Sequence, residues 1–365
     1  MKAIALFFLT LIFTSTAYGQ DLPRRGLFVS LIQEPPVLAS RQDIQNLVDF
    51  AKKTGTQTLF VQIYRSNIAW FPSKVADSRP YEACRKDLAA DPFRLLIKEA
   101  HAAGMEVHAW LNCLSLSANE NAPLLKKYGP EILTRNLKEK KTLKDYKIDN
   151  QYFLEPGDLR VRETLSTVVG EILRAYPALD GIQFDYIRYP DKNPDYGYTQ
   201  MNRARFKKMT GCQTIDAESP VWKDWKRAQV TDLLRTLVKK ARAIRPNIQI
   251  STTGLMPYYR ANLEAYQDWR YWLNHGIVDF VTLMCYAPDV PEFEKYISDA
   301  KKKMGDLSKV NIAVGAYRLL ATPEIFEKQW DLCEDSGARA CVTLHYGNLL
   351  QNPVLAKPLI RNKKS

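Results

Sequence analysis

Two carboxylate residues have the setting that acid–base or nucleophilic chemistry requires. Asp185 lies in the segment DGIQFDYIRYP, at 180–190, where apolar Ile182 and Phe184 alternate with polar residues. A strand with this pattern places Asp185 on its polar face, and a buried carboxylate costs several kcal/mol unless it is paired or opens into a polar cavity. Glu155 lies in YFLEPGD, at 152–158, just before an expected helix. We predict that these two carboxyl groups form a catalytic pair, one acid and one base or nucleophile, of the kind that hydrolyses a glycosidic bond.

Each carboxylate also has a structural explanation. Asp185 could form a salt bridge with Arg188 or Arg65, and Glu155 could offset the dipole of the helix that follows it. Weaker candidates for the same chemistry follow expected strands or lie near them, and they are Glu34, Asp268 and Asp289.

Aromatic and hydrogen-bonding side chains gather at the ends of the expected strands. Because side chains alternate along a strand, its two faces can be separated from the sequence. One face carries groups such as Gln62, Trp110 and Asn112, whereas the other carries aliphatics such as Val61 and Ile182. Rings interleaved with hydrogen-bonding groups suit a sugar, which has apolar faces and hydroxyl edges. We predict that the substrate-binding residues are Tyr64, Arg65, Trp110, Asn112, Gln183, Arg188, Tyr286, Asp289, Tyr317 and His345.

Strand-like and helix-like segments alternate along the chain and position these residues. Helix-like segments have apolar spacing near 3.6, as at Ile44, Leu47, Val48 and Ala51. The alternation predicts an α/β fold, a single (β/α)8 TIM barrel with long loops at the C-terminal face of the strands. An open, doubly wound sheet is the competing fold, but no GxGxxG or P-loop follows the first strand. The expected strands are 24–30, 57–64, 106–112, 180–185, 248–253, 279–286, 311–317 and 340–345, and the long loops are 65–90, 114–156 and 187–220.

The first residues have the features of a signal peptide. Lys2 precedes an apolar run at 3–13, and Ala17 and Gly19 are small residues before a cleavage site. The run is too short to span a bilayer, and no later stretch reaches about 18 apolar residues; a retained N-terminal anchor is the alternative. We therefore expect a signal peptide at 1–19, a barrel domain at 20–350 and a C-terminal tail at 351–365. The expected protein is an exported monomer of the periplasm or the extracellular space, without a membrane span.

Composition narrows the classes of partner and chemistry. Hydrophobic residues make up 46% and charged residues 25%, which is ordinary for a globular protein. The net charge of +12 favours anionic polymers such as cell-wall glycans, but the positive charges are spread along the chain, so we expect no nucleic-acid partner. The four histidines lack metal-ligand spacing and no GxSxG elbow is present, so we expect no metal, no cofactor and no serine-hydrolase chemistry. Export permits disulfides among the six cysteines, whose pairing the sequence leaves open.

Several blocks of sequence, taken together, resemble a known family. They are DGIQFDYIRYP, GMEVHAWLN, FLEPGDLRVRETL and DWRYWLNHGIVDFVTLMCY. With RRGLFVS and TQTLFVQIY, they resemble the glycosyl-hydrolase-like family 10 barrels over 24–347. The resemblance implies a secreted or envelope (β/α)8 protein that acts on polysaccharide. The family usually has an aspartate where this chain has Glu155, which keeps a carboxyl group but alters its reach.

The expected function is that of an exported glycoside hydrolase. Its substrate would be an anionic or cell-wall glycan, with peptidoglycan or a related amino-sugar polysaccharide favoured by export and basicity. The acetamido-assisted mechanism of family-18 chitinases is not expected, because Ile187 stands where their strand pattern has a glutamate. The alternative is a catalytically inactive, lectin-like barrel that binds glycan. An interaction scaffold is a third possibility, and it predicts a barrel mouth without paired carboxylates.

Overall fold

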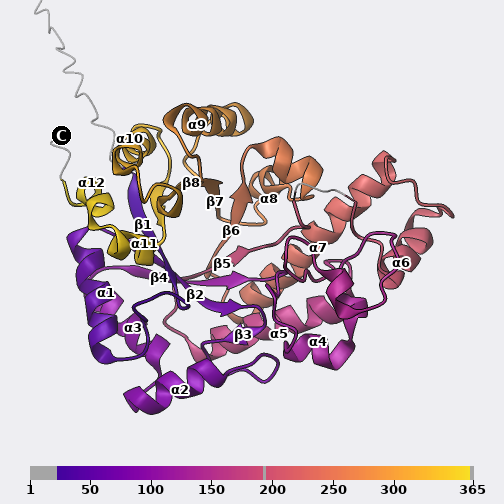
Figure 1. Ribbon diagram of the computed structural model, residues 1–365, viewed down its shortest axis with the longest axis horizontal. Helices are drawn as coiled ribbons and strands as arrows, with labels where there is room; N and C mark the ends of the chain where they lie inside the picture. The colour runs from indigo at the N-terminus through magenta and orange to yellow at the C-terminus, as the bar shows by residue number, and fades with distance from the viewer. Residues whose placement is uncertain (1–22, 192–194, 362–365) are drawn as a thin grey trace, which may run out of the picture.

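A computed structural model describes residues 23–191 and 195–361 of the chain (Figure 1). The predicted signal peptide at 1–19 lies outside the described residues. Parallel strands pair in the order β1, β2, β4, β5, β6, β7, β8 and β9, and β9 pairs with β1 to close a barrel. The predicted (β/α)8 barrel is therefore confirmed. The strands are β1 (Arg24–Ser30), β2 (Thr58–Arg65), β4 (Glu106–Asn112), β5 (Gly181–Asp185), β6 (Gln249–Leu255), β7 (Phe280–Cys285), β8 (Val310–Gly315) and β9 (Ala340–Leu344).

Helices follow the strands and surround the barrel (Figure 1). The helices after successive strands are α1 (Arg41–Lys53), α3 (Pro92–Ala102), α5 (Leu159–Ala175), α7 (Pro220–Ile244), α8 (Trp269–Asn274), α9 (Val290–Met304), α10 (Pro323–Glu334) and α11 (Tyr346–Gln351). Further elements lie in the connections and at the C-terminus: β3 (Ile68–Ala69), α2 (Arg79–Leu88), α4 (Pro123–Tyr128), α6 (Gln200–Thr210) and α12 (Lys357–Ile360). Short turns of 3-10 or π-helix are η1 (Pro130–Ile132), η2 (Leu143–Tyr146), η3 (Arg260–Glu264), η4 (Ala316–Arg318) and η5 (Pro353–Ala356).

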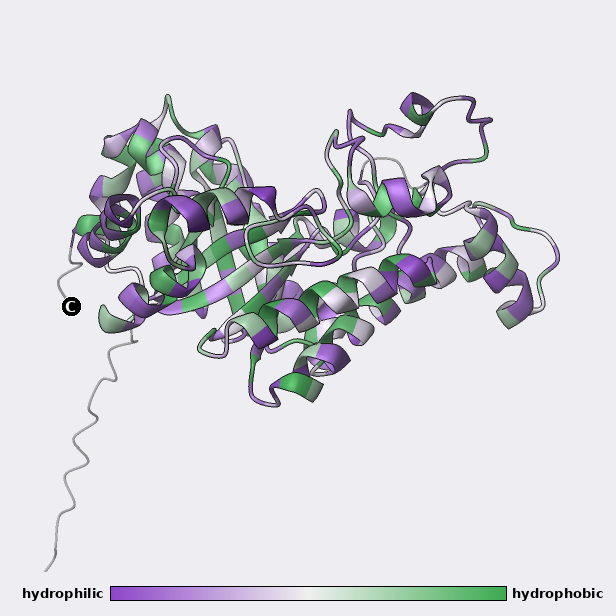
Figure 2. Ribbon diagram, turned by 90° about the horizontal axis from the view of Figure 1, so that it is seen from below, coloured by the Kyte–Doolittle hydropathy of each residue, from purple (hydrophilic) through white to green (hydrophobic). Residues whose placement is uncertain are grey.

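The strands separate an aliphatic layer from an aromatic one. Residues such as Leu27 and Val107 face outward and pack with the helices, including the apolar stripe of α1 that begins at Ile44. Residues on the opposite face, such as Phe28 and Phe60, form a second buried cluster inside the barrel with Trp110 and Phe280. Figure 2 shows apolar residues along the barrel strands and polar residues on the outward sides of the helices. The alternation of side chains along each strand produces this division.

A buried polar layer lies inside the barrel across β5 to β8. Gln183 Oε1 accepts hydrogen bonds from Ser251 Oγ at 3.3 Å and from Thr282 Oγ1 at 3.0 Å. Asn311 Nδ2 donates to Thr282 Oγ1 at 3.2 Å. Each of these side chains is fully buried, and a buried polar group without a partner costs about 1–3 kcal/mol. These hydrogen bonds link β5, β6, β7 and β8 in a polar floor below the mouth of the barrel.

The connections at 114–156 and 187–220, together with α7, form a side lobe of the barrel. Gly197 N donates to Thr134 Oγ1 at 3.1 Å, which joins the two connections. Tyr198, Phe206 and Trp222 form a separate buried cluster at the outer part of the lobe. Figure 1 shows α4, α6 and one end of α7 grouped on one side of the molecule. Both connections follow strand C-termini, as predicted.

The C-terminal segment is part of the fold, which corrects the expected tail at 351–365. From 351 to 361 the chain forms η5 and α12, and Leu355 and Leu359 are buried in the main core. Arg25 of β1 donates to the backbone oxygen of Leu359 at 2.5 Å, and Arg361 pairs with Asp331 of α10. Apolar residues between the last strand and the Lys-rich end provide this packing, so the ordered barrel domain extends to 361.

Cys333 of α10 and Cys341 of β9 form a disulfide. Cys84, Cys113, Cys212 and Cys285 are free. The pairing that the sequence left open is therefore a single link between a helix and the strand that closes the barrel. Across 23–191 and 195–361, no helix is long and apolar enough to cross a membrane.

Candidate active site

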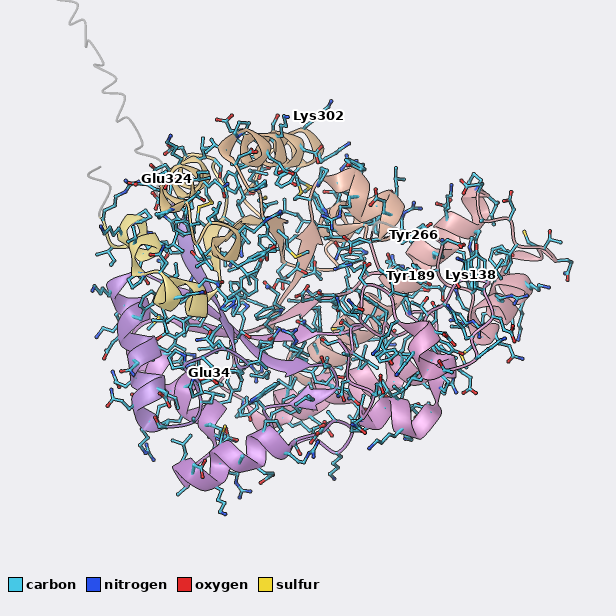
Figure 3. All side chains as sticks on the ribbon, in the orientation of Figure 1. Glu34, Lys138, Tyr189, Tyr266, Lys302 and Glu324 are labelled. Atoms are coloured by element: carbon cyan, nitrogen blue, oxygen red, sulfur yellow. A yellow bond between two sulfur atoms is a disulfide. The ribbon has the colours of Figure 1, made fainter. Side chains whose placement is uncertain are left out.

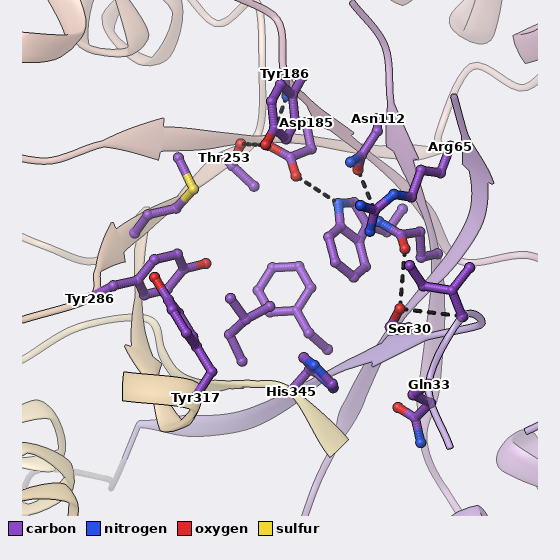
Figure 4. Close-up of a pocket in the computed structure, with 16 residues that line it drawn as sticks. Ser30, Gln33, Arg65, Asn112, Asp185, Tyr186, Thr253, Tyr286, Tyr317 and His345 are labelled. Atoms are coloured by element: carbon purple, nitrogen blue, oxygen red, sulfur yellow. Dashed lines mark hydrogen bonds between the residues drawn. The ribbon is translucent and has the colours of Figure 1, made fainter. Parts of the chain in front are cut away.

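A cavity of about 600 Å³ opens at the C-terminal ends of the barrel strands (Figure 4). Its volume falls within the range of small-molecule sites, and its position is the one that TIM barrels use for catalysis. Seven barrel strands contribute side chains, and the turn η4 that follows β8 contributes Tyr317. The lining residues are Phe28, Ser30, Ile32, Gln33, Gln62, Arg65, Trp110, Asn112, Asp185, Tyr186, Thr253, Met284, Tyr286, Tyr317, Leu344 and His345.

Asp185 is held at the cavity wall by three hydrogen-bond donors. Oδ1 accepts from Thr253 Oγ1 at 2.6 Å and from the backbone N–H of Tyr186 at 2.7 Å, and Oδ2 accepts from Trp110 Nε1 at 3.0 Å. Tyr186 has a φ of 54°, a left-handed conformation that is uncommon outside glycine. The carboxylate is 5% exposed, so these donors replace most of its water.

The salt bridge expected as the structural explanation for Asp185 does not form. Arg188 instead pairs with Asp191 at 2.9 Å. Within the described residues, Arg65 makes no ion pair within 4.0 Å. Asp185 is therefore held by neutral donors that point it toward the cavity.

Aromatic residues line two sides of the cavity. Trp110 packs edge-on against Phe28 with ring centroids 4.8 Å apart. Across the cavity, Tyr286 and Tyr317 pack edge-to-face at 5.6 Å, and Figure 4 shows the Tyr286 hydroxyl pointing into the open space. Burial, with a contribution from the Asp185 charge, raises the pKa of Tyr286 well above its usual value. Tyr286 therefore stays protonated and can donate a hydrogen bond to a ligand.

Amide groups form a short chain beside Asp185. Gln62 Oε1 accepts from Ser30 Oγ at 3.3 Å, and Gln62 Nε2 donates to Asn112 Oδ1 at 3.1 Å. All three side chains line the cavity and are more than 90% buried. This chain fixes the amide orientations, so their remaining donor and acceptor positions are available to a ligand.

His345 lines the opposite side of the cavity as a neutral ring. Its Nδ1 accepts from the backbone N–H of Gly347 at 3.1 Å, at the start of α11. Burial lowers the pKa of His345. A neutral imidazole that accepts at Nδ1 carries its proton on Nε2, so His345 can offer one N–H.

Tyr64 does not reach the cavity, contrary to the alternation expected for its strand. The pairing of β2 with β4 shifts between Gln62 and Tyr64, which is a β-bulge, and it reverses the direction of the side chains beyond it. Tyr64 is buried in the outer core, where its hydroxyl accepts from Asn67 Nδ2 at 3.1 Å. The bulge instead brings the next residue, Arg65, to the cavity.

Glu155 does not line the cavity that contains Asp185. Its carboxyl group is completely buried in the side lobe, where Oε1 accepts from the Tyr189 hydroxyl at 2.5 Å and from Gly157 N at 3.3 Å. Burial raises its pKa. The predicted catalytic pair is therefore not brought together here, because the 114–156 connection folds into the lobe and encloses Glu155.

Three other predicted binding residues lie outside the cavity lining. Gln183 belongs to the buried polar floor described above. The guanidinium of Arg188 lies 4.6 Å from the centre of the Tyr186 ring and does not line the cavity. Asp289 caps α9 by accepting from Glu292 N at 2.8 Å, and it lines a different hollow. The contacts of these three residues within the protein are therefore structural, and none of the three lines the cavity.

The remaining predicted residues, Arg65, Trp110, Asn112, Tyr286, Tyr317 and His345, all lie together at the cavity. Sequence reasoning missed Ser30, Gln33, Tyr186 and Thr253. Ser30 and Thr253 could have been found by applying the strand alternation to the first and fifth expected strands. Tyr186 lines the cavity because its backbone is in the left-handed conformation, which the sequence pattern does not predict. In the described chain, no group of three or more His, Cys, Asp or Glu residues is placed to hold a metal ion.

Comparison with known proteins assigns this barrel to a family. The sequence profile of the glycosyl hydrolase-like 10 family matches residues 24–331. The chain belongs to the glycosyl hydrolase-like 10 family. The match includes β1 to β8 and every cavity residue up to Tyr317, whereas β9 and His345 lie beyond it.

Curated relatives are described as glycosyl hydrolases. Glycosyl hydrolase DigH of Escherichia coli (strain K12) is 23% identical over 356 residues, which covers 87% of this chain and 78% of that protein. Glycosyl hydrolase YngK of Bacillus subtilis (strain 168) is 24% identical over 276 residues, which covers 68% of this chain and 50% of that protein.

Solved structures with the same fold include glycoside-cleaving enzymes. The catalytic domain of β-amylase from Paenibacillus polymyxa has a TM-score of 0.56 at 12% identity, covering 90% of this chain and 94% of that chain. A chitinase from Rhizomucor miehei has a TM-score of 0.52 at 11% identity, covering 93% of this chain and 100% of that chain. At these identities the likeness concerns the fold alone.

Proposed function

We propose that the protein is an exported glycoside hydrolase that cleaves a cell-wall glycan, peptidoglycan or a related amino-sugar polymer. The observation that carries the proposal is Asp185, a carboxylate fixed by three donors at the wall of an aromatic and amide-lined cavity. Membership of a glycosyl hydrolase-like family and relatives described as glycosyl hydrolases support the same class.

Asp185 is the group that we assign to the reacting centre. A carboxylate that accepts three hydrogen bonds is held in one orientation, so no reorganisation is needed when a sugar enters. In that position it can attack the anomeric carbon, activate a water molecule or stabilise the positive charge that develops on the sugar ring. Trp110 and Tyr286 would then contact the sugar on either side, through a ring face and through a hydroxyl.

The proton for the leaving oxygen requires a second group. Among the described residues, Asp185 is the only carboxylate in the cavity lining. Glu34 is exposed in a hollow that shares Gln33 and His345 with the cavity, whereas Glu155 is enclosed by the side lobe. We therefore place Glu34 ahead of Glu155 as the proton donor.

Two further features support export and an anionic polymer. Stable disulfides form in oxidising compartments, and the link between Cys333 and Cys341 fits an exported chain. The net charge of +12 favours association with anionic envelope polymers. The cell envelope is also where the proposed substrate, a cell-wall glycan, is found.

The lectin-like alternative is favoured by one observation, the single carboxylate in the cavity. Purified protein incubated with peptidoglycan glycan strands, chitin oligosaccharides and uronate polymers separates the two functions. New reducing ends, absent with the Asp185→Asn variant, support hydrolysis. Saturable binding of a glycan without release of reducing ends from any of them supports the binding function and contradicts hydrolysis.

A further inference from the structure

Arg65 brings a positive charge to the cavity. Its side chain lines the same cavity as Asp185, and Figure 4 shows it beside Asn112, reaching toward the cavity. Across the described residues, the structure gives Arg65 no side-chain hydrogen bond and no ion pair. Two other arginines differ, because both Arg188 and Arg260 pair with Asp191. A half-buried guanidinium that no described residue pairs with is free to form charge-assisted hydrogen bonds with an anion.

The local backbone is built to aim Arg65 at the cavity. The bulge after Gln62 turns Tyr64 outward and Arg65 inward. The next two residues, Ser66 and Asn67, have φ values of 56° and 58°, a left-handed turn that costs free energy outside glycine. Strained turns and bulges of this kind occur where a functional side chain must be re-aimed.

Asn67 holds this turn in place. Its side-chain amide donates to the Tyr64 hydroxyl at 3.1 Å and to the backbone oxygen of Val75 at 3.3 Å, and its Oδ1 accepts from Leu124 N at 2.8 Å. Beyond the turn, Arg65 pairs with Ile68 of β3. The direction of Arg65 is therefore set by the fold rather than by a salt bridge.

The chemistry of the cavity selects the kind of anion. A planar guanidinium matches a planar carboxylate through two parallel hydrogen bonds. The other charged group of the lining is Asp185, and His345 is neutral. A single negative charge on the ligand balances Arg65, whereas a doubly charged phosphate would also be repelled by Asp185. The amides of Gln62 and Asn112 lie beside Arg65 and suit the neutral remainder of a sugar.

We propose that Arg65 binds a carboxylate on the substrate, so that the sugar seated beside Asp185 is an acidic one. The proposal rests on the proposed function, since it names a chemical feature of the glycan that this site takes. Two sources supply such a carboxylate, the lactyl ether of muramic acid and the carboxyl of a uronic acid. Arg65 is in this view a specificity-determining residue for the same reaction.

The test compares matched acidic and neutral ligands by calorimetry in an Asp185→Asn background, so that binding is read without turnover. The ligands are an oligosaccharide of alternating N-acetylglucosamine and N-acetylmuramic acid, its carboxyl-reduced form, an oligogalacturonate and its methyl ester. Low-salt buffer avoids screening of the charge interaction. Arg65→Gln removes the positive charge, and Arg65→Lys keeps the charge but lacks the paired N–H groups of the guanidinium. Arg79→Gln replaces an exposed arginine on α2 and is the control.

We expect at least one acidic ligand to bind about tenfold or more tightly than its neutral form, because a guanidinium and a carboxylate form two parallel charge-assisted hydrogen bonds. Arg65→Gln should abolish that ratio, Arg65→Lys should reduce it, and Arg79→Gln should preserve it. The ligand pair that shows the ratio identifies the source of the carboxylate.

Equal binding of acidic and neutral forms, a preference that survives Arg65→Gln, or no binding of any acidic ligand would overturn the proposal. The ligand comparison needs no change at Arg65, so it stands even if Arg65→Gln fails to fold. Reducing-end release by the wild-type chain is scored separately. Hydrolysis of neutral and acidic glycans at equal rates would leave the proposed function intact while removing the role of Arg65.

Discussion

The hydroxyl of Thr253 gives the shortest of the three hydrogen bonds to Asp185, at 2.6 Å. Trp110 donates to the other carboxylate oxygen and at the same time closes one side of the cavity. Both donors come from neighbouring strands on either side of β5, so the orientation of the carboxylate depends on three strands of the barrel. At the scale of single residues, catalysis should therefore be sensitive to the donors as well as to Asp185 itself.

Thr253→Val keeps the shape of the side chain and removes its hydroxyl. Because a hydrogen bond to a charged group contributes about 1.5–3 kcal/mol, we expect kcat/KM for glycan cleavage to fall about tenfold or more. Steady-state kinetics with reducing-end detection measures this effect. Thr167→Val on α5 is the matched control, since its hydroxyl donates to a carbonyl of its own helix. Unchanged kinetics in Thr253→Val would show that this donor does not hold the reacting carboxylate.

Glu155→Gln should leave cleavage within a few-fold of wild type, because the carboxyl group is enclosed in the side lobe and does not line the cavity. Glu34→Gln, measured in parallel, should lower the rate if the exposed loop supplies the proton. A loss of activity in Glu155→Gln, with Glu34→Gln active, would restore the pair that the sequence predicts.

Glu155→Gln also has a predicted effect on stability against pH. Burial raises the pKa of Glu155 above its usual value of 4.5, so the folded chain keeps this proton after the unfolded chain has lost it. The free energy of unfolding of the wild type should therefore fall as pH rises from about 4.5 toward the raised pKa. Glutamine does not titrate. The free energy of unfolding of the variant, measured by urea denaturation, should therefore rise relative to that of the wild type over that pH range. A constant difference across pH would contradict the assigned burial effect.

Among the secondary-structure elements, α12 differs most from the sequence prediction, because it packs where a C-terminal tail was expected. Leu359 is 2% exposed and Ile360, the next residue, is 40% exposed. Leu359→Ala should lower the free energy of unfolding by about 2–5 kcal/mol, because it removes buried methyl groups and leaves a cavity. Ile360→Ala should change it by less than about 1 kcal/mol, as expected at an exposed site. Urea denaturation of both variants measures the contrast, and equal effects would show that 351–361 does not pack as described.

The strands and the barrel could be predicted from sequence because their apolar periodicity is local. Phe184 and Asp185 fall on opposite faces by counting alone, and the structure places them there. Tyr64 could not be placed by counting, because one extra residue in β2 reverses the alternation and nothing in its sequence marks the bulge. Glu155 was misplaced for a different reason. Its position depends on how two long connections pack together, and such long-range contacts leave no periodic signal.

At the scale of the whole molecule, the barrel depends on a segment that the family profile does not reach. The match ends at 331, yet β9 closes the sheet by pairing with both β8 and β1. The disulfide between Cys333 and Cys341 ties that strand to α10. Figure 3 shows Tyr189, the partner of Glu155, in the side lobe beside Tyr266, with Glu34 well separated from both. The two candidate proton donors therefore belong to different parts of the molecule, and Asp185 is common to either mechanism.

Asp185 is the residue to which we assign the hydrolysis of a glycan, and the turnover of an Asp185→Asn variant decides whether that assignment holds. The variant keeps the side-chain shape, although its amide nitrogen must face one of the existing donors, so a loss of about 1–3 kcal/mol in stability is expected. Circular dichroism and the melting temperature confirm folding, and Asp49→Asn on α1 is the control for an exposed aspartate. Reducing-end release from cell-wall glycan should fall at least about a hundredfold in Asp185→Asn, while Asp49→Asn matches wild type. Turnover by a folded Asp185→Asn variant within a few-fold of wild type would show that Asp185 is not the catalytic carboxylate.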